Sequence, residues 1–200
     1  KADFLVNEAT KRGLAAIVNI HHFDAFTSDP VGQREKFIAI WRQLATHYAA
    51  APASVAFELL NEPKDAATTD VLNPIYADAI REIRKTNPTR AILVGPGKWN
   101  QVSELPHLRL PDDDLNLIVT VHCYDPFQFT HQGASWAGPE VRALKGIQFP
   151  GPPKTPLVPD STAKLSSSVL DWIKRYNTQP AESNPSSPHE FHGVVQQAKE

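Results

Sequence analysis

Several residue types with specialised roles are scarce or missing in this chain of 200 residues. Its one cysteine, Cys123, excludes an internal disulfide and a zinc site built from several thiolates. No unbroken apolar run is longer than that at 14–18, whereas a membrane-spanning helix needs about 20 apolar residues. Lys and Arg number 20 and Asp and Glu 22, and this net charge of -2 is too small to favour binding of nucleic acid.

Methionine is absent altogether, so Lys1 is not a translation start. The first ten residues have the pattern of a helix rather than the central apolar region of a signal peptide. We therefore expect the sequence to be part of a longer protein, with any targeting segment upstream of Lys1.

The remaining composition is typical of one soluble globular domain, with 41% hydrophobic and 21% charged residues. Proline is the exception, because the chain has 18 prolines and they concentrate between Pro150 and Pro188. We expect this last quarter to be built differently from the rest.

Helical and strand-like patterns alternate along the first part of the chain. The predicted helical segments are 4–13, 37–48, 75–83, 163–176 and one that begins after Pro188. The predicted strands are the apolar runs 14–20, 55–60, 91–94 and 117–121. This alternation predicts an α/β protein with a parallel sheet, and the mostly continuous apolar strands predict a sheet covered on both faces.

Each predicted strand ends in side chains that suit a binding site better than a core. These are His21, His22, Asn61, Glu62, Lys98, Trp99, Asn100, His122 and Tyr124. Such residues at the carboxyl ends of strands are typical of the (β/α)8 TIM barrel. A doubly wound nucleotide-binding sheet would carry a glycine-rich loop, and Gly95-Pro-Gly97 lacks the required spacing. We predict a TIM barrel with four of its eight strands present.

Asn61-Glu62-Pro63 is the strongest catalytic signal. A carboxyl group held at the mouth of a barrel, partly out of water, can donate a proton to a glycosidic oxygen. The alternative is a carboxylate that caps a helix at the start of a loop.

The histidines allow two interpretations. His122 and Tyr124 stand two residues apart, so we expect both side chains on one side of the chain, although a neutral core histidine beside a packed tyrosine fits too. His21 and His22 are adjacent, so we expect them on opposite faces. No Asp or Cys completes a ligand set with them, so we predict sugar recognition rather than a metal site.

Aromatic side chains divide by their place in the pattern. Trp99 and Trp136 lie in predicted loops, where an exposed indole suits the apolar face of a sugar ring. Trp41 and Trp172 lie on apolar helical stripes and are predicted to be core residues.

Four motifs in order resemble glycoside hydrolase family 5, especially its bacterial endoglucanases and mannanases. They are NIHH at 19–22, FELLNEP at 57–63, GPGKW at 95–99 and HCYDPFQFTHQGASW at 122–136. The resemblance extends from Lys1 to about Ala137. It implies a retaining endo-β-glycanase that needs no cofactor and hydrolyses β-1,4-linked, cellulose-like polysaccharide, with mannan or mixed-linkage glucan as alternative substrates.

The resemblance also implies residue roles. Glu62 would be the acid/base, Asn61 would contact the sugar 2-hydroxyl, and His122 and Tyr124 would orient the nucleophile and the substrate. The implied substrate-binding residues are His21, His22, Trp99, His131 and Trp136.

The family's nucleophile motif, Gly-Glu-Phe-Gly, is absent, so we expect the nucleophile outside these residues and the isolated chain to be inactive. Glu58 lies four strand residues before Glu62, roughly 13 Å away, so it is predicted to be a residue of the barrel interior. The other carboxylates considered are Asp24, Asp65 and Asp125 near strand ends and Glu190 at a helix start.

By resemblance the chain divides into a barrel match at 1–137, a proline-rich loop with a helix at 138–188 and the start of a further helix at 189–200. A half-barrel would expose strand edges and apolar surface. A polysaccharide substrate implies a secreted or periplasmic parent protein. We also expect the full-length protein to be a monomer without membrane or nucleic-acid partners. Three other classes stay open: a non-catalytic carbohydrate-binding barrel, a metal-dependent barrel hydrolase and a structural interaction module.

Overall fold

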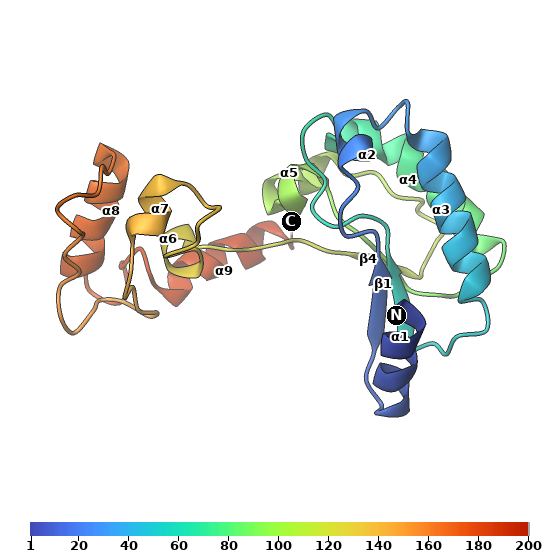
Figure 1. Ribbon diagram of the computed structural model, residues 1–200, viewed down its shortest axis with the longest axis horizontal. Coiled ribbons are helices and arrows are strands. Elements are labelled where there is room, and N and C mark those ends of the chain that lie inside the picture. Colours follow the sequence, from blue (N-terminus) through green and yellow to red (C-terminus); the bar gives the residue numbers. More distant parts are fainter. Residues whose placement is uncertain (200) are drawn as a thin grey trace. The chain divides into compact units, whose positions relative to one another are not determined.

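Strands and helices alternate in the first 122 residues, as the spacing of apolar residues predicts (Figure 1). The computed structural model describes residues 1–199, without the side chain of Glu190. It divides the chain into two units, Lys1–His122 and Cys123–Glu200. Glu200, the last position of the helix expected at 189–200, lies outside the described residues, and so does the side chain of Glu190.

The sheet of the first unit has four parallel strands in the order β1-β2-β3-β4. The strands are β1 (Ala16–Asn19), β2 (Val55–Glu58), β3 (Ile92–Val94) and β4 (Leu117–Val119). All four were predicted, and each is shorter than its apolar run. The neighbours in this order pair directly, which confirms the parallel topology that the alternation of patterns predicts.

Six helical segments connect or precede these strands. They are α1 (Ala2–Lys11), α2 (Asp24–Ser28), α3 (Arg34–His47), α4 (Thr69–Arg84), α5 (Gly97–Asn100) and the 3-10 helix η1 (Val102–His107). The long helices α1, α3 and α4 were predicted from their apolar stripes. The short ones were not, because four to six residues are too few for a periodic pattern.

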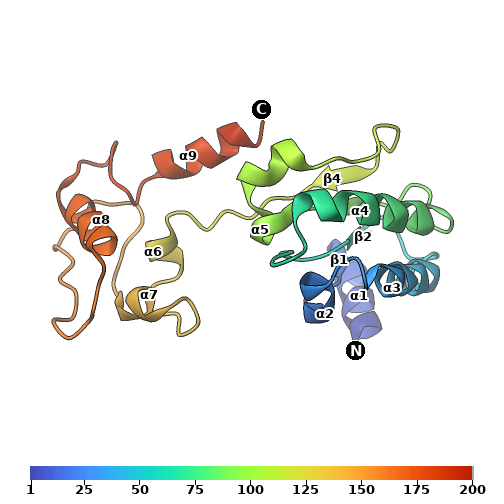
Figure 2. The ribbon, with the colours of Figure 1, turned by 90° about the horizontal axis from the view of Figure 1, so that it is seen from above.

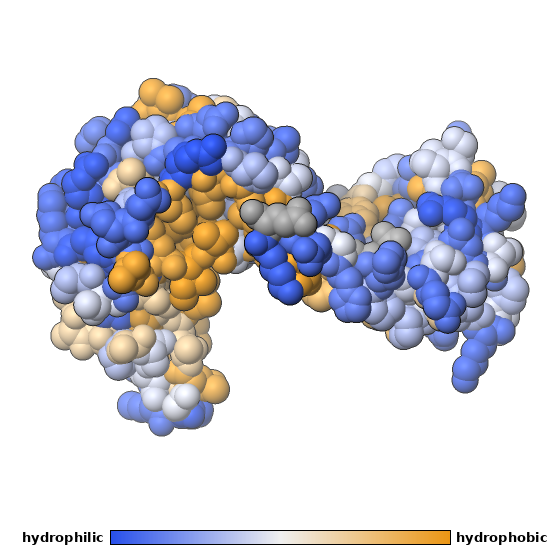
Figure 3. Space-filling view, turned by 180° about the vertical axis from the view of Figure 1, so that it is seen from behind, coloured by the Kyte–Doolittle hydropathy of each residue, from blue (hydrophilic) through white to orange (hydrophobic). Residues whose placement is uncertain are grey.

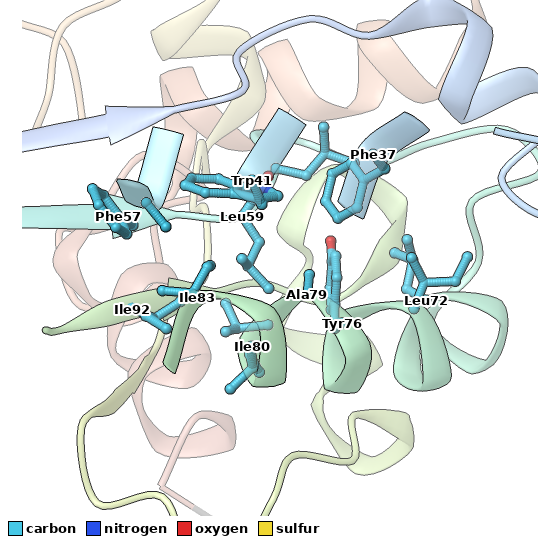
Figure 4. Close-up of a cluster of buried hydrophobic side chains, with 14 of the residues drawn as sticks. Phe37, Trp41, Phe57, Leu59, Leu72, Tyr76, Ala79, Ile80, Ile83 and Ile92 are labelled. Atoms are coloured by element: carbon cyan, nitrogen blue, oxygen red, sulfur yellow. Dashed lines mark hydrogen bonds between the residues drawn. The ribbon is translucent and has the colours of Figure 1, made fainter. Parts of the chain in front are cut away.

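The core of the first unit lies between the sheet and the helices α3 and α4. Figure 4 shows side chains of α3, including Trp41, and of α4, including Ile80, pointing toward residues of the strands. Trp41 is fully buried, as predicted, and its indole N–H donates to the carbonyl oxygen of Leu59 at 3.1 Å. Packing on this face fixes the strands whose ends carry the predicted site.

The opposite face of the sheet is largely bare. Residues Ile17 and Ile118 point away from the Phe57 side of the sheet, and they are 54% and 49% exposed. Hydrophobic atoms gather on one face of the first unit in Figure 3. A sheet covered on both faces was therefore the wrong expectation for this chain, because α3 and α4 pack on one side only. The expectation of exposed apolar surface is confirmed.

The second unit contains helices joined by long irregular segments (Figure 2). Its helices are α6 (Phe127–Thr130), α7 (Pro139–Ala143), α8 (Ser167–Thr178) and α9 (Pro188–Gln197). A small core forms around α8, where Trp172 is 7% exposed, as predicted, and stacks on Tyr176. Among the helices of residues 1–199, none is long and apolar enough to cross a lipid bilayer.

Candidate active site

Backbone hydrogen bonds join the segments that follow the four strands. They run from Asn61 N to Ile20 O at 3.0 Å, from Trp99 N to Pro63 O at 2.9 Å and from His122 N to Asn100 O at 2.9 Å. The helical segments α2 and α5, which follow β1 and β3, lie at the same end of the sheet (Figure 1). These bonds bring the predicted residues of the first unit to one edge, the carboxyl edge of a parallel sheet.

Glu62 stands at the centre of this edge in an unusual backbone conformation. Its φ is 47°, in the left-handed region that non-glycine residues rarely adopt. Its Oε1 lies 2.7 Å from His122 Nδ1, and the two side chains are 28% and 21% exposed. With the proton placed on Nδ1, the imidazole donates to the carboxylate and fixes its direction. A strained, oriented and partly exposed carboxyl group is suited to proton transfer.

Asn61 precedes Glu62 and is partly buried. Its N–H bond to Ile20 anchors the backbone directly before the glutamate. Glu58, earlier on β2, is 8% exposed and accepts a hydrogen bond from Asn19 Nδ2 at 2.9 Å. This burial agrees with the prediction of an interior residue.

The segment α5 is a left-handed turn rather than an ordinary helix. Lys98, Trp99 and Asn100 have φ values of 50°, 59° and 59°. Left-handed conformation costs a non-glycine residue about 1–2 kcal/mol, so other contacts must hold this turn. Trp99 is 50% exposed on it, in agreement with an indole that is open to a ligand.

Asn100 was predicted to face the binding site because it follows a strand, and this prediction was wrong. It is fully buried, and a Cβ at Gly95 would lie 2.4 Å from its Nδ2. The left-handed turn directs the amide into the space that glycine leaves empty. Its side-chain nitrogen and oxygen have no hydrogen-bond partner among the residues that the structure describes.

The side chains of Lys98, Thr69 and Glu104 hold the start of the turn together with the backbone amide of Gly97. We call these four groups the Glu104 cluster. Lys98 Nζ lies 2.6 Å from Glu104 Oε1, and the Thr69 hydroxyl donates to Glu104 Oε2 at 2.8 Å. The same hydroxyl accepts from Gly97 N at 3.0 Å. Hydrogen bonds from Lys98 and then from Thr69 hold the pKa of the Glu104 carboxyl below its ordinary value of 4.5.

Thr69 and Glu104 were not predicted as site residues. Thr69 is the first residue of α4 and Glu104 lies in η1, and no motif links them. Only the fold brings them to Lys98, so their spacing along the chain carries no signal.

His21 and His22 differ from their predicted arrangement. Both are exposed, and their rings meet edge to face with centroids 4.6 Å apart. The prediction of opposite faces was wrong because β1 ends at Asn19, so strand alternation does not extend to the histidines. Among the side chains that the structure describes, no group of three or more His, Cys, Asp and Glu is arranged to hold a metal ion.

The remaining predicted residues belong to the second unit, where they form an aromatic cluster. His131 stacks on Phe127 with centroids 4.0 Å apart and meets Tyr124 and Trp136 edge to face at 5.1 and 5.0 Å. His131 is 7% exposed, whereas Trp136 is 76% exposed. The histidine therefore supports the rings, and the indole presents its surface. Phe127, on α6, completes the cluster.

Asp24, Asp65 and Asp125 are exposed. Asp24 begins α2, and Asp65 has a φ of 57° in the loop after Glu62. These three residues stay alternatives on geometry alone.

Comparison with known proteins agrees with this architecture. Residues 1–182 match a family model described as cellulase, glycosyl hydrolase family 5. Endoglucanase H of Acetivibrio thermocellus is 36% identical over 138 residues, which make up 69% of this chain and 15% of that protein. The chain spans less than half the length of the curated relatives Endoglucanase H and Endoglucanase C.

Solved structures match over longer stretches. Cellulose synthase subunit Z of Clostridioides difficile superimposes with a TM-score of 0.73 at 30% identity, covering 99% of this chain and 56% of that one. Cel5A of Thermotoga maritima in complex with cellobiose gives 0.70 at 39% identity, covering 76% and 49%. The same protein has also been solved with mannotriose. Together with the four parallel strands, these matches confirm a partial (β/α)8 barrel.

Proposed function

The chain belongs to glycosyl hydrolase family 5, the cellulase family, and on this premise we propose that it is part of an endo-acting β-glycanase. The proposed substrate is β-1,4-linked glucan of the cellulose type. The observation that carries the proposal is the Glu62 carboxyl group, held 2.7 Å from His122 at the carboxyl edge of the sheet. Trp99, half exposed, follows the neighbouring strand.

In the proposed reaction Glu62 acts first as an acid. Its proton passes to the glycosidic oxygen while the bond between that oxygen and the anomeric carbon breaks and a carboxylate nucleophile bonds to the same carbon. Glu62, now ionised, then takes a proton from a water molecule, whose oxygen displaces the nucleophile. The His122 hydrogen bond keeps the Glu62 oxygens in one direction through both steps.

The nucleophile is the second carboxylate that this reaction needs. A retaining pair is separated by roughly 5–5.5 Å, and Glu58 is buried in the strand below Glu62. We expect a glutamate outside these 200 residues to supply it, and we therefore expect the isolated chain to bind sugar without hydrolysing it. Asp24, Asp65, Asp125 and Glu190 are the alternatives within the chain.

Sugar binding is proposed for exposed aromatic and imidazole groups. In the first unit these are Trp99, His21 and His22. In the second unit they are Trp136 and Tyr124, with the buried His131 in contact with both rings. Indole faces pack on the apolar faces of pyranose rings without distinguishing strongly between glucose and mannose. Mannan and mixed-linkage glucan are therefore the alternative substrates. Because such polymers lie outside cells, we propose a secreted or periplasmic protein.

A non-catalytic carbohydrate-binding barrel is the second candidate, and the exposed Trp136 favours it equally. The two candidates differ in what Glu62 does. Release of reducing ends from carboxymethyl cellulose, mannan and lichenan would be measured for the 200 residues alone and for the complete product of the gene. Each would be compared with its Glu62→Gln variant.

We expect the complete product to be active, with β-glucan as its best substrate, and Glu62→Gln to reduce that activity by about 10²–10⁴-fold. The matched control is Glu82→Gln, which alters a carboxylate on the outer helix α4. Binding without hydrolysis by every form, unaffected by Glu62→Gln, would favour the binding barrel. Hydrolysis by the 200 residues alone would place the nucleophile among Asp24, Asp65, Asp125 and Glu190.

A further inference from the structure

The left-handed turn at Lys98–Asn100 connects two parts of the proposed site. On one side the Trp99 amide donates to the carbonyl oxygen of Pro63, the residue after Glu62, at 2.9 Å. On the other side Asn100 O accepts from His122 N at 2.9 Å, and the His122 ring reaches Glu62. The position of the turn therefore sets the positions of Trp99 and of the His122 backbone together.

The turn is poorly favoured by its own sequence, because none of its three left-handed residues is glycine and only Asn100 is of a type that tolerates this conformation. Its conformation depends on contacts from outside. The Glu104 cluster supplies them at the start of the turn, through the Lys98 ammonium and the Gly97 amide.

The cluster is buried at its centre and exposed at one end. Thr69 is 1% exposed and Glu104 9%, whereas the Lys98 side chain is 65% exposed. An exposed ion pair contributes little by itself, so the buried Thr69 hydroxyl and Glu104 carboxylate carry most of the constraint. Gly97 packs closely against the start of α4, where a Cβ would lie 2.9 Å from the Thr69 backbone nitrogen.

We propose that Glu104 is a positioning residue of the glycanase site: through Thr69, Gly97 and Lys98 it holds the left-handed turn that places Trp99 and His122 beside Glu62. Glu104 does not touch the substrate in this arrangement. Its effect reaches Glu62 through the turn and the His122 hydrogen bond. The catalytic half of this inference rests on the proposed function, whereas the hold on the turn does not.

The hold on the turn can be measured without substrate, by hydrogen exchange of the amides in 97–101 followed by mass spectrometry. We expect Glu104→Gln and Thr69→Val to increase exchange of the Gly97 and Trp99 amides at least tenfold. Thr69→Ser keeps the hydroxyl and should restore protection. Lys98→Arg keeps the charge and should exchange more slowly than Lys98→Met.

Glu82→Gln is the matched control. Glu82 has a side chain that is 12% exposed and a lysine, Lys85, at 2.6 Å, so it resembles Glu104, whose side chain is 11% exposed. It lies on α4 away from the turn, and its removal should leave exchange of 97–101 unchanged. Near-UV circular dichroism identifies any variant that fails to fold. If Glu104→Gln fails to fold, the comparison of Thr69→Val with Thr69→Ser tests whether the cluster holds the turn.

Fluorescence gives a second signature, specific to Trp99. The difference between each variant and its Trp99→Phe counterpart isolates this indole from the other three tryptophans. We expect iodide quenching of the Trp99 signal to change in Glu104→Gln and Thr69→Val and to return to its original value in Thr69→Ser.

Activity of the complete gene product tests the catalytic half. We expect Glu104→Gln and Thr69→Val to lower kcat/KM on β-glucan at least tenfold, and Glu82→Gln to leave it unchanged. Unchanged exchange in both Glu104→Gln and Thr69→Val would overturn the inference, and so would faster exchange with kcat/KM equal to that of Glu82→Gln. If no form hydrolyses or binds glycan while exchange responds as expected, the proposed function has failed and the hold on the turn stands.

Discussion

The two units of the chain are stabilised in different ways. In Lys1–His122 a parallel sheet packs on α3 and α4 through large buried side chains such as Trp41 and Phe57. In Cys123–Glu200 the buried apolar cluster is much smaller, and side-chain amides hold the irregular segments. Gln132 and Asn177, for example, each bond to the backbone of a segment 15 or 20 residues away. The first unit thus combines a large apolar core with buried polar contacts, whereas the second relies mainly on individual polar contacts.

The largest effect is expected from Arg90, which joins the start of the sheet to the loop after α3. Its buried guanidinium donates to the carbonyl oxygens of Tyr48, Ala51, Pro52 and Val55. Arg90→Met should lower the free energy of unfolding of the first unit by about 4 kcal/mol. Hydrogen bonds to a charged group contribute roughly 1.5–3 kcal/mol each and are not additive.

Urea-dependent hydrogen exchange, followed peptide by peptide, separates the two units, because a single denaturation midpoint is not defined for such a chain. Peptides of β1 to β3 should lose protection at lower urea in Arg90→Met, and α8 should not. Equal loss in α8 would show that the units unfold together and would contradict the comparison.

Asn184 is the corresponding polar contact of the second unit. It is fully buried, its Nδ2 donates to Tyr176 O and Gln179 O at 2.9 Å each, and its Oδ1 accepts from Ser186 N at 3.0 Å. Asn184→Ala should destabilise α8 by about 2–3 kcal/mol, since it leaves buried backbone groups unpaired. In the same exchange experiment the strands of the first unit should be unaffected. If α8 kept its protection, polar contacts would not be what holds this unit.

Acid should weaken the first unit through its ion pairs. The Arg84 guanidinium beside Asp114 holds the pKa of that carboxyl below its ordinary value of 3.8, and the two side chains are 17% and 12% exposed. Because the folded pKa is the lower one, the pair stabilises the fold above about pH 3.8 and this contribution is lost as pH falls through the folded pKa.

The expected size is about 1 kcal/mol, the upper end for an ion pair near the surface. Unfolding of wild type and Asp114→Asn would be compared at pH 6 and pH 3. The two proteins should differ at pH 6, and the difference should be smaller at pH 3. A constant difference at both values would assign the effect of Asp114 to packing instead of charge.

The same contrast explains what the sequence could predict. Apolar periodicity located α3, α4 and all four strands, because burial on one side of an element repeats at a fixed spacing. It also placed Trp41 in the core, while the rise per residue of a strand placed Glu58 below Glu62 in the interior. The expectation that polar side chains after parallel strands meet at one edge assigned Glu62 and His122 to one site. In the structure Glu62 Oε1 and His122 Nδ1 are 2.7 Å apart.

Features set by single contacts between distant residues were missed. The left-handed turn has no glycine at its three special positions, and Thr69, which holds it, lies 28 residues before Gly97. The arrangement of His21 and His22 was wrong because the end of β1 could not be located within two residues. The short helices α6 and α7 in the second unit carry no periodic pattern.

The central claim is that Glu62 donates the proton to the leaving group. Its most direct test compares kcat/KM of the complete gene product and its Glu62→Gln variant on two aryl β-cellobiosides. Phenol needs a proton to leave, whereas 2,4-dinitrophenolate does not. We predict that Glu62→Gln reduces kcat/KM by about 10²–10⁴-fold for the phenyl substrate and by less than about tenfold for the dinitrophenyl substrate. An equal loss on both substrates, or no loss on either, would contradict the assignment.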